Sequence, residues 1–290
     1  MKKTVLITGC SSGLGLAAAV LFAHRGYRVY ATMRNLAKRG ALEQAAGPEL
    51  TGRDGALQVR QLDVTDAASV DRCVSGVLEE TGRIDVLINN AGAGFARTTE
   101  QTSEEELHWL MDVNYFGTVR CCRAVLPGMR ERGSGHIVNV SSVGGLVGQP
   151  FNELYCATKF AVEGYTEGLA SYLTEGFGLR FTAVEPGGMR SAFFDSATAA
   201  TLTDGKMDAG PYQPLLQRYL GGSARRAETG ETGVFQTPEE VAAVLLGVVT
   251  ADDPPVRIRT SEWAERLCRL KTQADPMGRK QRDRVVEMFL

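Results

Sequence analysis

Residues 4–24 read TVLITGCSSGLGLAAAVLFAH, a stretch in which a strand, a glycine turn and a helix follow one another. Thr4–Thr8 is short and rich in β-branched residues, as buried strands are. The glycines after it let the backbone turn tightly and approach a phosphate, and the helix that begins near Leu16 directs its positive N-terminal end there. The stretch therefore predicts a dinucleotide-binding loop, although its G-x-x-x-G-x-G spacing also suits an ordinary glycine-rich turn.

Composition excludes several classes of protein. The 290-residue chain has 32 Lys and Arg against 34 Asp and Glu, and this balance predicts no nucleic-acid partner. Its six cysteines form no C-x-x-C pair and its three histidines lack metal-ligand spacing, so we expect free thiols and no metal site. The longest apolar run, Val241–Val249, is much shorter than the ~20 residues of a membrane span. Residues 8–15 interrupt the apolar stretch after Lys2 and Lys3, so we expect no secretory signal and a cytoplasmic location.

Short apolar strands alternate with amphipathic helices, as in a parallel sheet covered on both faces. We therefore predict an α/β fold for residues 1–290, with one doubly wound, seven-stranded and mostly parallel sheet. The helices include one around Ser103–Arg130 that begins with a capping box and one that begins at Thr237. The expected strands are Thr4–Thr8, Arg28–Thr32, Ala56–Leu62, Ile84–Asn89, His136–Ser141, Arg180–Glu185 and Val256–Ile258.

Polar or otherwise unusual residues follow six of these strands directly. Ligands bind along the carboxyl edge of open α/β sheets, so these residues predict a site at that edge. They are Gly9, Arg34, Asp63, Asn89 with Asn90, Ser142 and Pro186.

Tyr155 and Lys159 form a candidate catalytic pair, with Ser142 upstream. Their i,i+4 spacing places both side chains on one face of a helix. A phenol titrates near ~10, and a neighbouring ammonium is expected to lower that pKa toward neutrality. The Ser142 hydroxyl is suited to hydrogen-bond the oxygen of a reacting carbonyl or alcohol. Alone, a Y-x-x-x-K string is also typical of an exposed tyrosine and lysine one turn apart.

The ordered set of motifs resembles the short-chain dehydrogenase/reductase family, and within it the members that act on hydroxysteroids and retinol. This resemblance implies a single Rossmann domain that transfers hydride to or from a nicotinamide cofactor. The matching elements are Thr8-Gly9-x-x-x-Gly13-x-Gly15, Asp63-Val64, Asn89-Asn90-Ala91-Gly92, Asn114, Ser142, Tyr155-x-x-x-Lys159 and Pro186-Gly187.

The resemblance also implies roles for individual residues. Tyr155 is the acid or base, Lys159 lowers its pKa and binds the nicotinamide ribose, Ser142 orients the substrate oxygen, and Asn114 completes a proton relay through water. For Asn114, in the middle of a predicted helix, the alternative is a solvent-facing side chain. Ser191 stands where the family often has threonine after Pro-Gly. The implied cofactor contacts are Gly9, Ser11, Ser12, Gly13, Leu14, Gly15, Asp63, Val64, Asn90, Ala91, Gly92, Tyr155, Lys159, Pro186, Gly187, Met189 and Ser191.

Arg34 decides the expected cofactor. A site for NAD needs a carboxylate near the end of the second strand, and no Asp or Glu follows that strand before Glu43. Arg34 can instead bind a 2′-phosphate through paired hydrogen bonds, so we predict NADP(H). Lys38 and Arg39 are equally consistent with a solvated basic loop.

The stretch at about 190–233 is rich in small residues and predicts a substrate lid, or alternatively a disordered surface insertion. Ser142, Val143, Tyr155 and Phe194 are the predicted substrate contacts, and the substrate is expected to be a small lipophilic ketone, aldehyde or secondary alcohol. By resemblance, a steroid-binding histidine corresponds to Gly222 here and its acidic partner to Glu287. Loss of the histidine weakens the case for a phenolic steroid.

The C-terminal stretch at about 261–290 is expected to form an amphipathic helical extension that packs on the domain, rather than one that docks on a membrane surface. The resemblance further implies a homodimer or homotetramer. The motifs and the resemblance together predict an NADP(H)-dependent oxidoreductase. The alternative is a catalytically silent NADP(H)-sensing regulatory protein. The intact set of Ser142, Tyr155 and Lys159 favours the enzyme, because a sensor needs no phenol.

Overall fold

A parallel sheet forms the centre of the protein in a computed structural model, which describes residues 2–52, 56–190, 209–228 and 235–289. Within those residues seven strands pair in the order β3-β2-β1-β4-β5-β6-β9, and every pairing is parallel. The predicted doubly wound sheet is confirmed, and it is parallel throughout. The strands are β1 (Thr4–Ile7), β2 (Arg28–Met33), β3 (Leu57–Gln61), β4 (Val86–Asn89), β5 (His136–Val140), β6 (Arg180–Glu185) and β9 (Arg257–Arg259).

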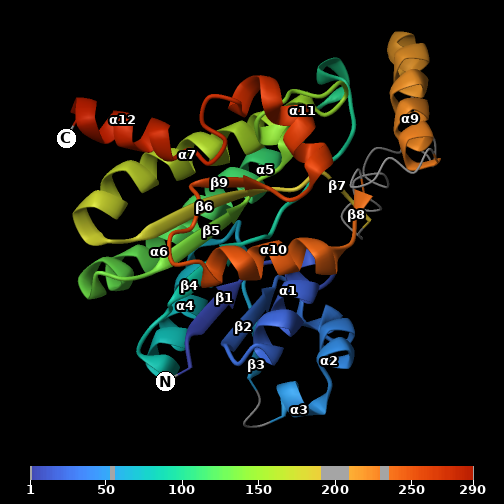
Figure 1. The fold of residues 1–290 in the computed structure, drawn as a ribbon. Coiled ribbons are helices and arrows are strands. Elements are labelled where there is room, and N and C mark those ends of the chain that lie inside the picture. The colour runs from blue at the N-terminus through green and yellow to red at the C-terminus, as the bar shows by residue number, and fades with distance from the viewer. Residues whose placement is uncertain (1, 53–55, 191–208, 229–234, 290) are drawn as a thin grey trace.

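Helices cover both faces of the sheet (Figure 1). Strand residues alternate between the two faces, so Val5 and Ile7 join one core cluster while Leu6 joins the other. The first cluster is closed by α1 (Gly13–His24), α2 (Gly40–Ala46) and α10 (Pro238–Thr250). The second is closed by α4 (Ala67–Thr81), α6 (Gly117–Arg132) and α7 (Glu153–Phe177).

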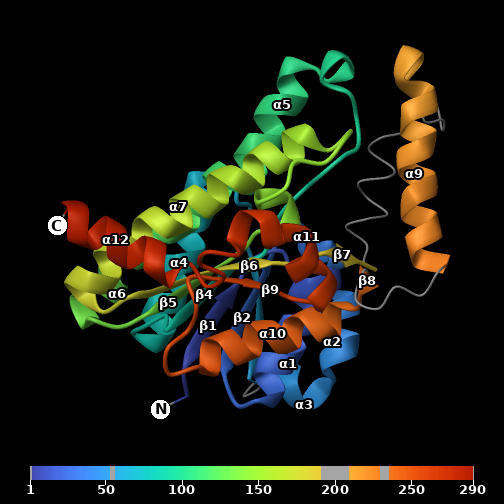
Figure 2. The same cartoon turned by 45° about the horizontal axis from the view of Figure 1, so that its top comes forward.

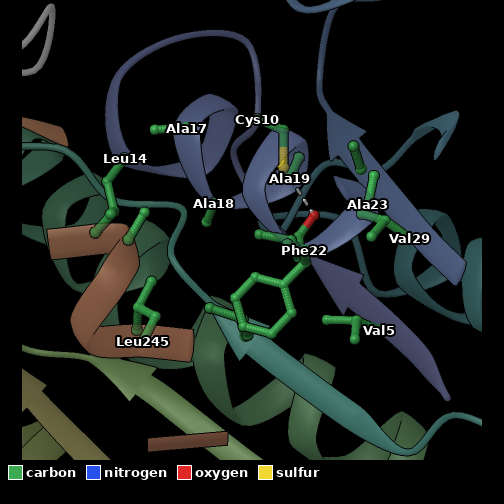
Figure 3. Packing of buried hydrophobic residues seen from close by; sticks show 14 of the residues in the cluster. Val5, Cys10, Leu14, Ala17, Ala18, Ala19, Phe22, Ala23, Val29 and Leu245 are labelled. Atoms are coloured by element: carbon green, nitrogen blue, oxygen red, sulfur yellow. Dashed lines mark hydrogen bonds between the residues drawn. The ribbon is translucent and has the colours of Figure 1, made fainter. Parts of the chain in front are cut away.

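Small residues let α1 pack closely on the sheet and on α10. Ala18 and Ala19 are fully buried, and Phe22 fills the space between α1 and the strands (Figure 3). A helix held this closely keeps its N-terminus fixed relative to the end of β1. The glycine loop between β1 and α1 therefore has a rigid support.

The predicted helix around Ser103–Arg130 is wrong in its continuity. It begins with the expected capping box of Ser103 and Glu106, but α5 (Glu104–Met111) passes into a π-helical turn, η3 (Asp112–Phe116), before α6 begins. A π-turn inserts a residue and rotates the side chains that follow it. Here it directs Asn114 into the interior, where only 1% of its surface is exposed.

The remaining elements lie around the sheet. The predicted lid contains η5 (Gly210–Tyr212) and α9 (Gln213–Glu228), and α9 stands beside the domain at the end where α5 lies (Figures 1 and 2). The C-terminal stretch forms α11 (Glu262–Thr272) and α12 (Arg279–Phe289), and α12 packs on α7. The other elements are η1 (Leu36–Lys38), α3 (Pro48–Thr51), η2 (Thr99–Gln101), η4 (Val143–Gly145), β7 (Gly188–Met189) and β8 (Phe235–Gln236).

The position of α12 corrects one expectation. Glu287 lies in α12 and pairs there with Arg284 at 3.3 Å. The helix α12 is at the opposite end of the domain from α9 (Figures 1 and 2). The helix that contains Gly222 is α9. Glu287 is therefore not the acidic partner of that position.

Candidate functional site

The glycine loop after β1 is held against the end of β4. Thr8 Oγ1 accepts hydrogen bonds from the backbone N–H groups of Asn90 and Ala91, each at 3.0 Å. Gly9 has φ +73°, and a Cβ added there would lie 2.8 Å from the Cα of Ala91. A Cβ on Gly15 would lie 2.3 Å from the carbonyl oxygen of Gly9. These positions accept only glycine.

The N-terminus of α1 has no side-chain cap. Ser12 occupies the N-cap position, and its side chain makes no capping hydrogen bond. The first N–H groups of a helix lack partners within the helix, and they favour a negative charge placed before them. Gly13, Leu14 and Gly15 form the first turn directly after the loop. The loop and helix therefore fit a pyrophosphate, as the sequence predicts.

Arg34 extends from the end of β2 into solvent. Its side chain has no hydrogen bond or ion pair with any described residue, whereas Arg39 pairs with Glu43 at 3.3 Å. At the neighbouring strand end, Asp63 Oδ1 accepts hydrogen bonds from the backbone N–H and the hydroxyl of Thr65, at 3.0 and 2.7 Å. Val64 follows and is buried. Arg34 and Asp63 thus lie at adjacent strand ends, because β2 pairs with β3.

Ser142, Tyr155 and Lys159 are brought together by β5, η4 and α7. Ser142 caps η4, its Oγ accepting the N–H of Gly144 at 3.0 Å, and it hydrogen-bonds the Tyr155 side chain. Lys159 lies one turn further along α7 and is 5% exposed. Its Nζ donates to the carbonyl oxygen of Val140 at 2.9 Å and lies 5.6 Å from the centroid of the Tyr155 ring.

The pKa of Tyr155 differs from the expectation. Burial raises it to about 12, while the hydrogen bond from Ser142 acts in the lowering direction. The Lys159 ammonium, which donates to the Val140 carbonyl and lies 5.6 Å from the centroid of the Tyr155 ring, does not offset the effect of burial here. Burial also lowers the pKa of Lys159 to about 8, an effect that a negative charge on Glu163 would oppose. The predicted lowering of the tyrosine pKa is therefore wrong for this structure.

Asn114 is tied to two segments of the site. Its Oδ1 accepts the N–H of Ala93 at 2.8 Å, and its Nδ2 donates to the Ala93 carbonyl at 2.9 Å and to Thr158 Oγ1 at 3.0 Å. A Cβ on Gly92 would lie 3.3 Å from Asn114 Oδ1 and 3.8 Å from Lys159 Nζ. The solvent-facing alternative for Asn114 is wrong. Its place in a proton relay stays a prediction.

The segment after β6 completes the edge of the site. The carbonyl oxygen of Pro186 accepts the N–H of Val143 at 2.9 Å, which joins this segment to the serine loop. The Val143 side chain is buried against Leu146 and α11, so its role as a substrate contact stays a prediction. Gly187 connects Pro186 to β7, in which Met189 pairs with β8. Ser191 and Phe194 lie outside the described residues.

A cavity of about 670 Å³ opens beside the N-terminal end of α7. This size lies within the usual range for small-molecule sites. Phe151, which has φ +60°, and Tyr219 contact each other across its wall with ring centroids 5.9 Å apart. The sequence does not predict most of this lining, because residues 98–100 and α9 carry no local binding signal. The cavity is lined by Thr98, Thr99, Glu100, Pro150, Phe151, Glu153, Tyr212, Leu215, Arg218 and Tyr219.

The cysteines are structural. All six are free and buried, and burial raises the pKa of Cys10 to about 12, so its thiol is a poor nucleophile. His136 is buried against Thr182 Oγ1 at 3.0 Å. No group of three or more potential metal ligands occurs in the ranges that the structure describes. None of the helices in those ranges is both long and apolar enough to cross a bilayer.

A doubly wound sheet with a glycine loop at the switch point between β1 and β4, and a proton-transfer set at the same edge, is typical of dinucleotide-dependent oxidoreductases. A family model described as short chain dehydrogenase matches residues 3–201. The chain belongs to this family, which confirms the resemblance.

Curated relatives resemble nearly the whole chain. Retinol dehydrogenase 8 of Bos taurus is 42% identical over 283 residues, which cover 95% of this chain and 86% of that protein. The 17-beta-hydroxysteroid dehydrogenase type 1 of Homo sapiens is 40% identical over 282 residues, covering 96% and 83%.

Solved structures share the fold. A short-chain dehydrogenase from Streptomyces avermitilis has a TM-score of 0.75 and 32% identity, covering 99% of this chain and 98% of that one. A variant of ElxO with NADPH bound has a TM-score of 0.72 and 26% identity, covering 90% and 97%.

Proposed function

We propose that this chain is an NADP(H)-dependent oxidoreductase that interconverts a lipophilic ketone or aldehyde and the corresponding alcohol, with Tyr155 as the acid or base. One observation carries the proposal. The Tyr155 side chain is hydrogen-bonded to Ser142, with the Lys159 ammonium one helical turn away, at the sheet edge that also holds the glycine loop. A phenol and a hydroxyl in that arrangement have the geometry to act on one substrate oxygen.

The cofactor would be held by residues from several strand ends. The pyrophosphate fits the Gly9–Gly15 loop and the start of α1, because the space that a Cβ would fill is kept open at both glycines. The exposed Arg34 guanidinium, with no partner among the described residues, is free for a 2′-phosphate, and the Ser12 hydroxyl at the start of α1 is proposed as a second contact. Similarity to a structure with NADPH bound also supports this cofactor. When bound, NADPH supplies the hydride that reduces a carbonyl carbon.

The protonation state of Tyr155 favours reduction. Because burial raises the pKa of Tyr155 to about 12, the phenol holds its proton at neutral pH. A neutral phenol can donate that proton to a carbonyl oxygen as negative charge develops there. Ser142 would hydrogen-bond the same oxygen and hold the substrate in place. The reverse reaction, oxidation of an alcohol, requires the phenolate and is expected to become faster as pH rises.

Asn114 would support proton return to Tyr155. Its side chain joins the segment that begins at Gly92 to α7, and the Gly92 position lies close to the Lys159 ammonium. A water between Asn114 and Lys159 would connect the active site to solvent. We propose this relay as part of the same mechanism.

The substrate is proposed to be steroid- or retinoid-like. The cavity beside Glu153 has two aromatic rings in its wall, and Pro150 and Leu215 extend its apolar surface. The similar proteins are named retinol dehydrogenase and 17-beta-hydroxysteroid dehydrogenase, and retinol and hydroxysteroids are lipophilic alcohols, which supports this class. A homodimer or homotetramer remains part of the proposal and is testable by light scattering.

Tyr155→Phe tests the proposal most directly. We expect this variant to bind NADPH with unchanged affinity but to lose NADPH oxidation with a panel of lipophilic ketones and aldehydes by more than about 100-fold. The matched control is Tyr27→Phe, since Tyr27 precedes β2 at the opposite edge of the sheet. Undiminished turnover in Tyr155→Phe would remove the acid–base assignment. NADPH binding without turnover in the unmodified protein, over the whole panel, would favour the sensor.

A further inference from the structure

Two buried glutamates lie directly behind the proposed catalytic residues. Glu163 follows Lys159 by one turn of α7, so Tyr155, Lys159 and Glu163 share one helix face. Glu185 is the last residue of β6, immediately before Pro186. Only 6% of Glu163 and none of Glu185 is exposed. The two carboxyls lie within hydrogen-bonding reach of each other, so the pair lies between the helix of the active site and the segment proposed to contact the cofactor.

Glu163 also reaches the loop that contains Ser142. A Cβ added to Gly145 would lie 2.9 Å from Cγ and 3.1 Å from Oε1 of Glu163, and 2.6 Å from Ser141 Oγ. Glycine at position 145 thus leaves the space that the Glu163 carboxyl and the Ser141 hydroxyl occupy. A change in the charge or position of this carboxyl would act on the serine loop and on α7 together.

The cations nearby neutralise Glu185 better than Glu163. Arg259 Nη1 lies 3.2 Å from Glu185 Oε2, while its Nε lies 2.6 Å from Glu265 Oε2. Arg257 is 3.1 Å from Glu167. These two arginines of β9 therefore serve carboxylates other than Glu163.

Glu163 itself has no cation in direct contact among the described residues. The Lys159 ammonium, one turn away on α7, donates to the Val140 carbonyl. The Cys268 thiol, which α11 brings to the same region, is neutral because burial raises its pKa to about 12. Ionised, Glu163 would be a buried charge without a counterion, which is costly.

The hydrogen bonds of the two carboxyls also indicate that one of them is protonated. Both carboxyl oxygens of Glu163 and Oε1 of Glu185 are buried without a hydrogen-bond donor of normal geometry in the described ranges. The Ser141 hydroxyl lies near enough to act on the Glu163 carboxyl as a hydrogen-bond donor, although not with normal geometry. Two carboxylates hydrogen-bond each other only when one of them provides a donor, so the contact between Glu163 and Glu185 requires one donor that heavy atoms do not reveal. A single proton on one carboxyl supplies that donor and removes one of the two negative charges.

We propose that Glu163 and Glu185 share one proton, which resides on Glu163, and that the neutral Glu163 is a positioning residue for Lys159 and the serine loop. Because Glu163 is uncharged, it contacts this region without forming an ion pair with Lys159. The ammonium is then left for the ribose of the proposed cofactor. The role of the pair in turnover depends on the proposed function, whereas the shared proton does not.

The electrostatics of the pair agree with this assignment. Burial, and then the negative charge of Glu185, raise the pKa of Glu163 well above its usual range. Burial also raises the pKa of Glu185, to about 7, but Arg259 acts in the opposite direction. The proton is therefore held more firmly by Glu163.

Infrared spectroscopy at pH 8 tests the shared proton without any substrate. Exposed carboxyl groups titrate near ~4 and are ionised there, so the carbonyl stretch of a protonated carboxyl would stand out. We expect this band in the unmodified protein and its loss in Glu163→Gln, an uncharged variant of nearly the same shape. Absence of the band from the unmodified protein, or its persistence in Glu163→Gln, would overturn the proposal.

The pKa of Lys159, followed by NMR of labelled lysine, tests the positioning role. Removing the charge of position 185 in Glu185→Gln lets Glu163 ionise, which should raise the pKa of Lys159 by about one unit. Glu163→Gln should leave the pKa of Lys159 near its original value, and Glu163→Gln/Glu185→Gln should restore it. The alkaline limb of the pH–rate profile for NADPH-dependent reduction should move in the same direction.

These readouts separate the two proposals. An unchanged pKa of Lys159 in folded Glu185→Gln would refute the positioning role. If Glu185→Gln does not fold, the infrared comparison with Glu163→Gln decides the shared proton alone. Failure to find turnover would remove the proposed function but leave the infrared and NMR results interpretable.

Discussion

Gly15→Ala should separate the need for glycine in the cofactor loop from the general effect of adding a methyl group to a helix. The new Cβ would lie 2.3 Å from the Gly9 carbonyl oxygen and 2.5 Å from Asn90 Nδ2. Asn90 is itself held by hydrogen bonds to the carbonyl oxygens of Thr8 and Gly9, at 2.8 and 3.1 Å, so neither neighbour moves easily. Overpacking of this kind costs about 1–3 kcal/mol, against a gain of about 1 kcal/mol in helix propensity.

The net expectation is a loss of about 1 kcal/mol in the free energy of unfolding and a much larger loss in NADPH affinity, because the loop must open where the pyrophosphate is expected to bind. The matched control is Gly168→Ala. Gly168 lies inside α7, and a Cβ added there would have no neighbouring atom within 4 Å, so alanine should stabilise the protein by about 1 kcal/mol. Thermal unfolding and NADPH fluorescence titration measure both effects. Wild-type unfolding temperature together with wild-type NADPH affinity in Gly15→Ala would refute the reasoning.

Two further predictions concern the cofactor and pH. Arg34→Asp should reverse the preference from NADPH to NADH, because a carboxylate repels a 2′-phosphate and accepts a hydrogen bond from a ribose hydroxyl. An unchanged ratio of kcat/KM for the two cofactors would show that Arg34 does not determine the cofactor preference. His136 has its pKa lowered to about 3, mainly by burial, so the folded state binds fewer protons than the unfolded state below about pH 6.5. Stability should therefore fall by up to about 1.4 kcal/mol per pH unit as pH decreases through that window. Denaturant titrations at several pH values measure this change in the free energy of unfolding. It should be smaller in His136→Gln, whereas replacement of the exposed His24 by Gln should leave it as in the unmodified protein.

Local patterns in the sequence predict the sheet and the position of the site. β-Branched strands such as β1 and the turn residues that follow them are signals contained within a few positions. Because every strand of this sheet is parallel, residues after the strands necessarily gather at one edge. Arg34, Asp63 and Ser142 are predicted at that edge for this reason. Their common location follows from topology rather than from recognition of each residue.

The π-helical turn at Asp112–Phe116 has no comparably clear local pattern. Its hydrophobic periodicity continues that of α5 and α6, so the sequence predicts one helix. The turn is favoured by long-range contacts, in which Asn114 bonds to Ala93 and Thr158. An asparagine in the middle of a helix is the only hint. Likewise, the cavity lining at residues 98–100 depends on how a loop without regular pattern packs against α9.

Burial explains why the chemistry of the site differs from the simplest sequence-based expectation. Spacing alone places Lys159 beside Tyr155 and suggests a phenolate, but spacing does not indicate how much water reaches either group. In the folded chain, desolvation raises the pKa of Tyr155 and lowers that of Lys159, so both groups are shifted toward their neutral forms. The same effect acts on Glu163. With protons held on its oxygen acids at neutral pH, the proposed site is expected to protonate a carbonyl more readily than it deprotonates an alcohol.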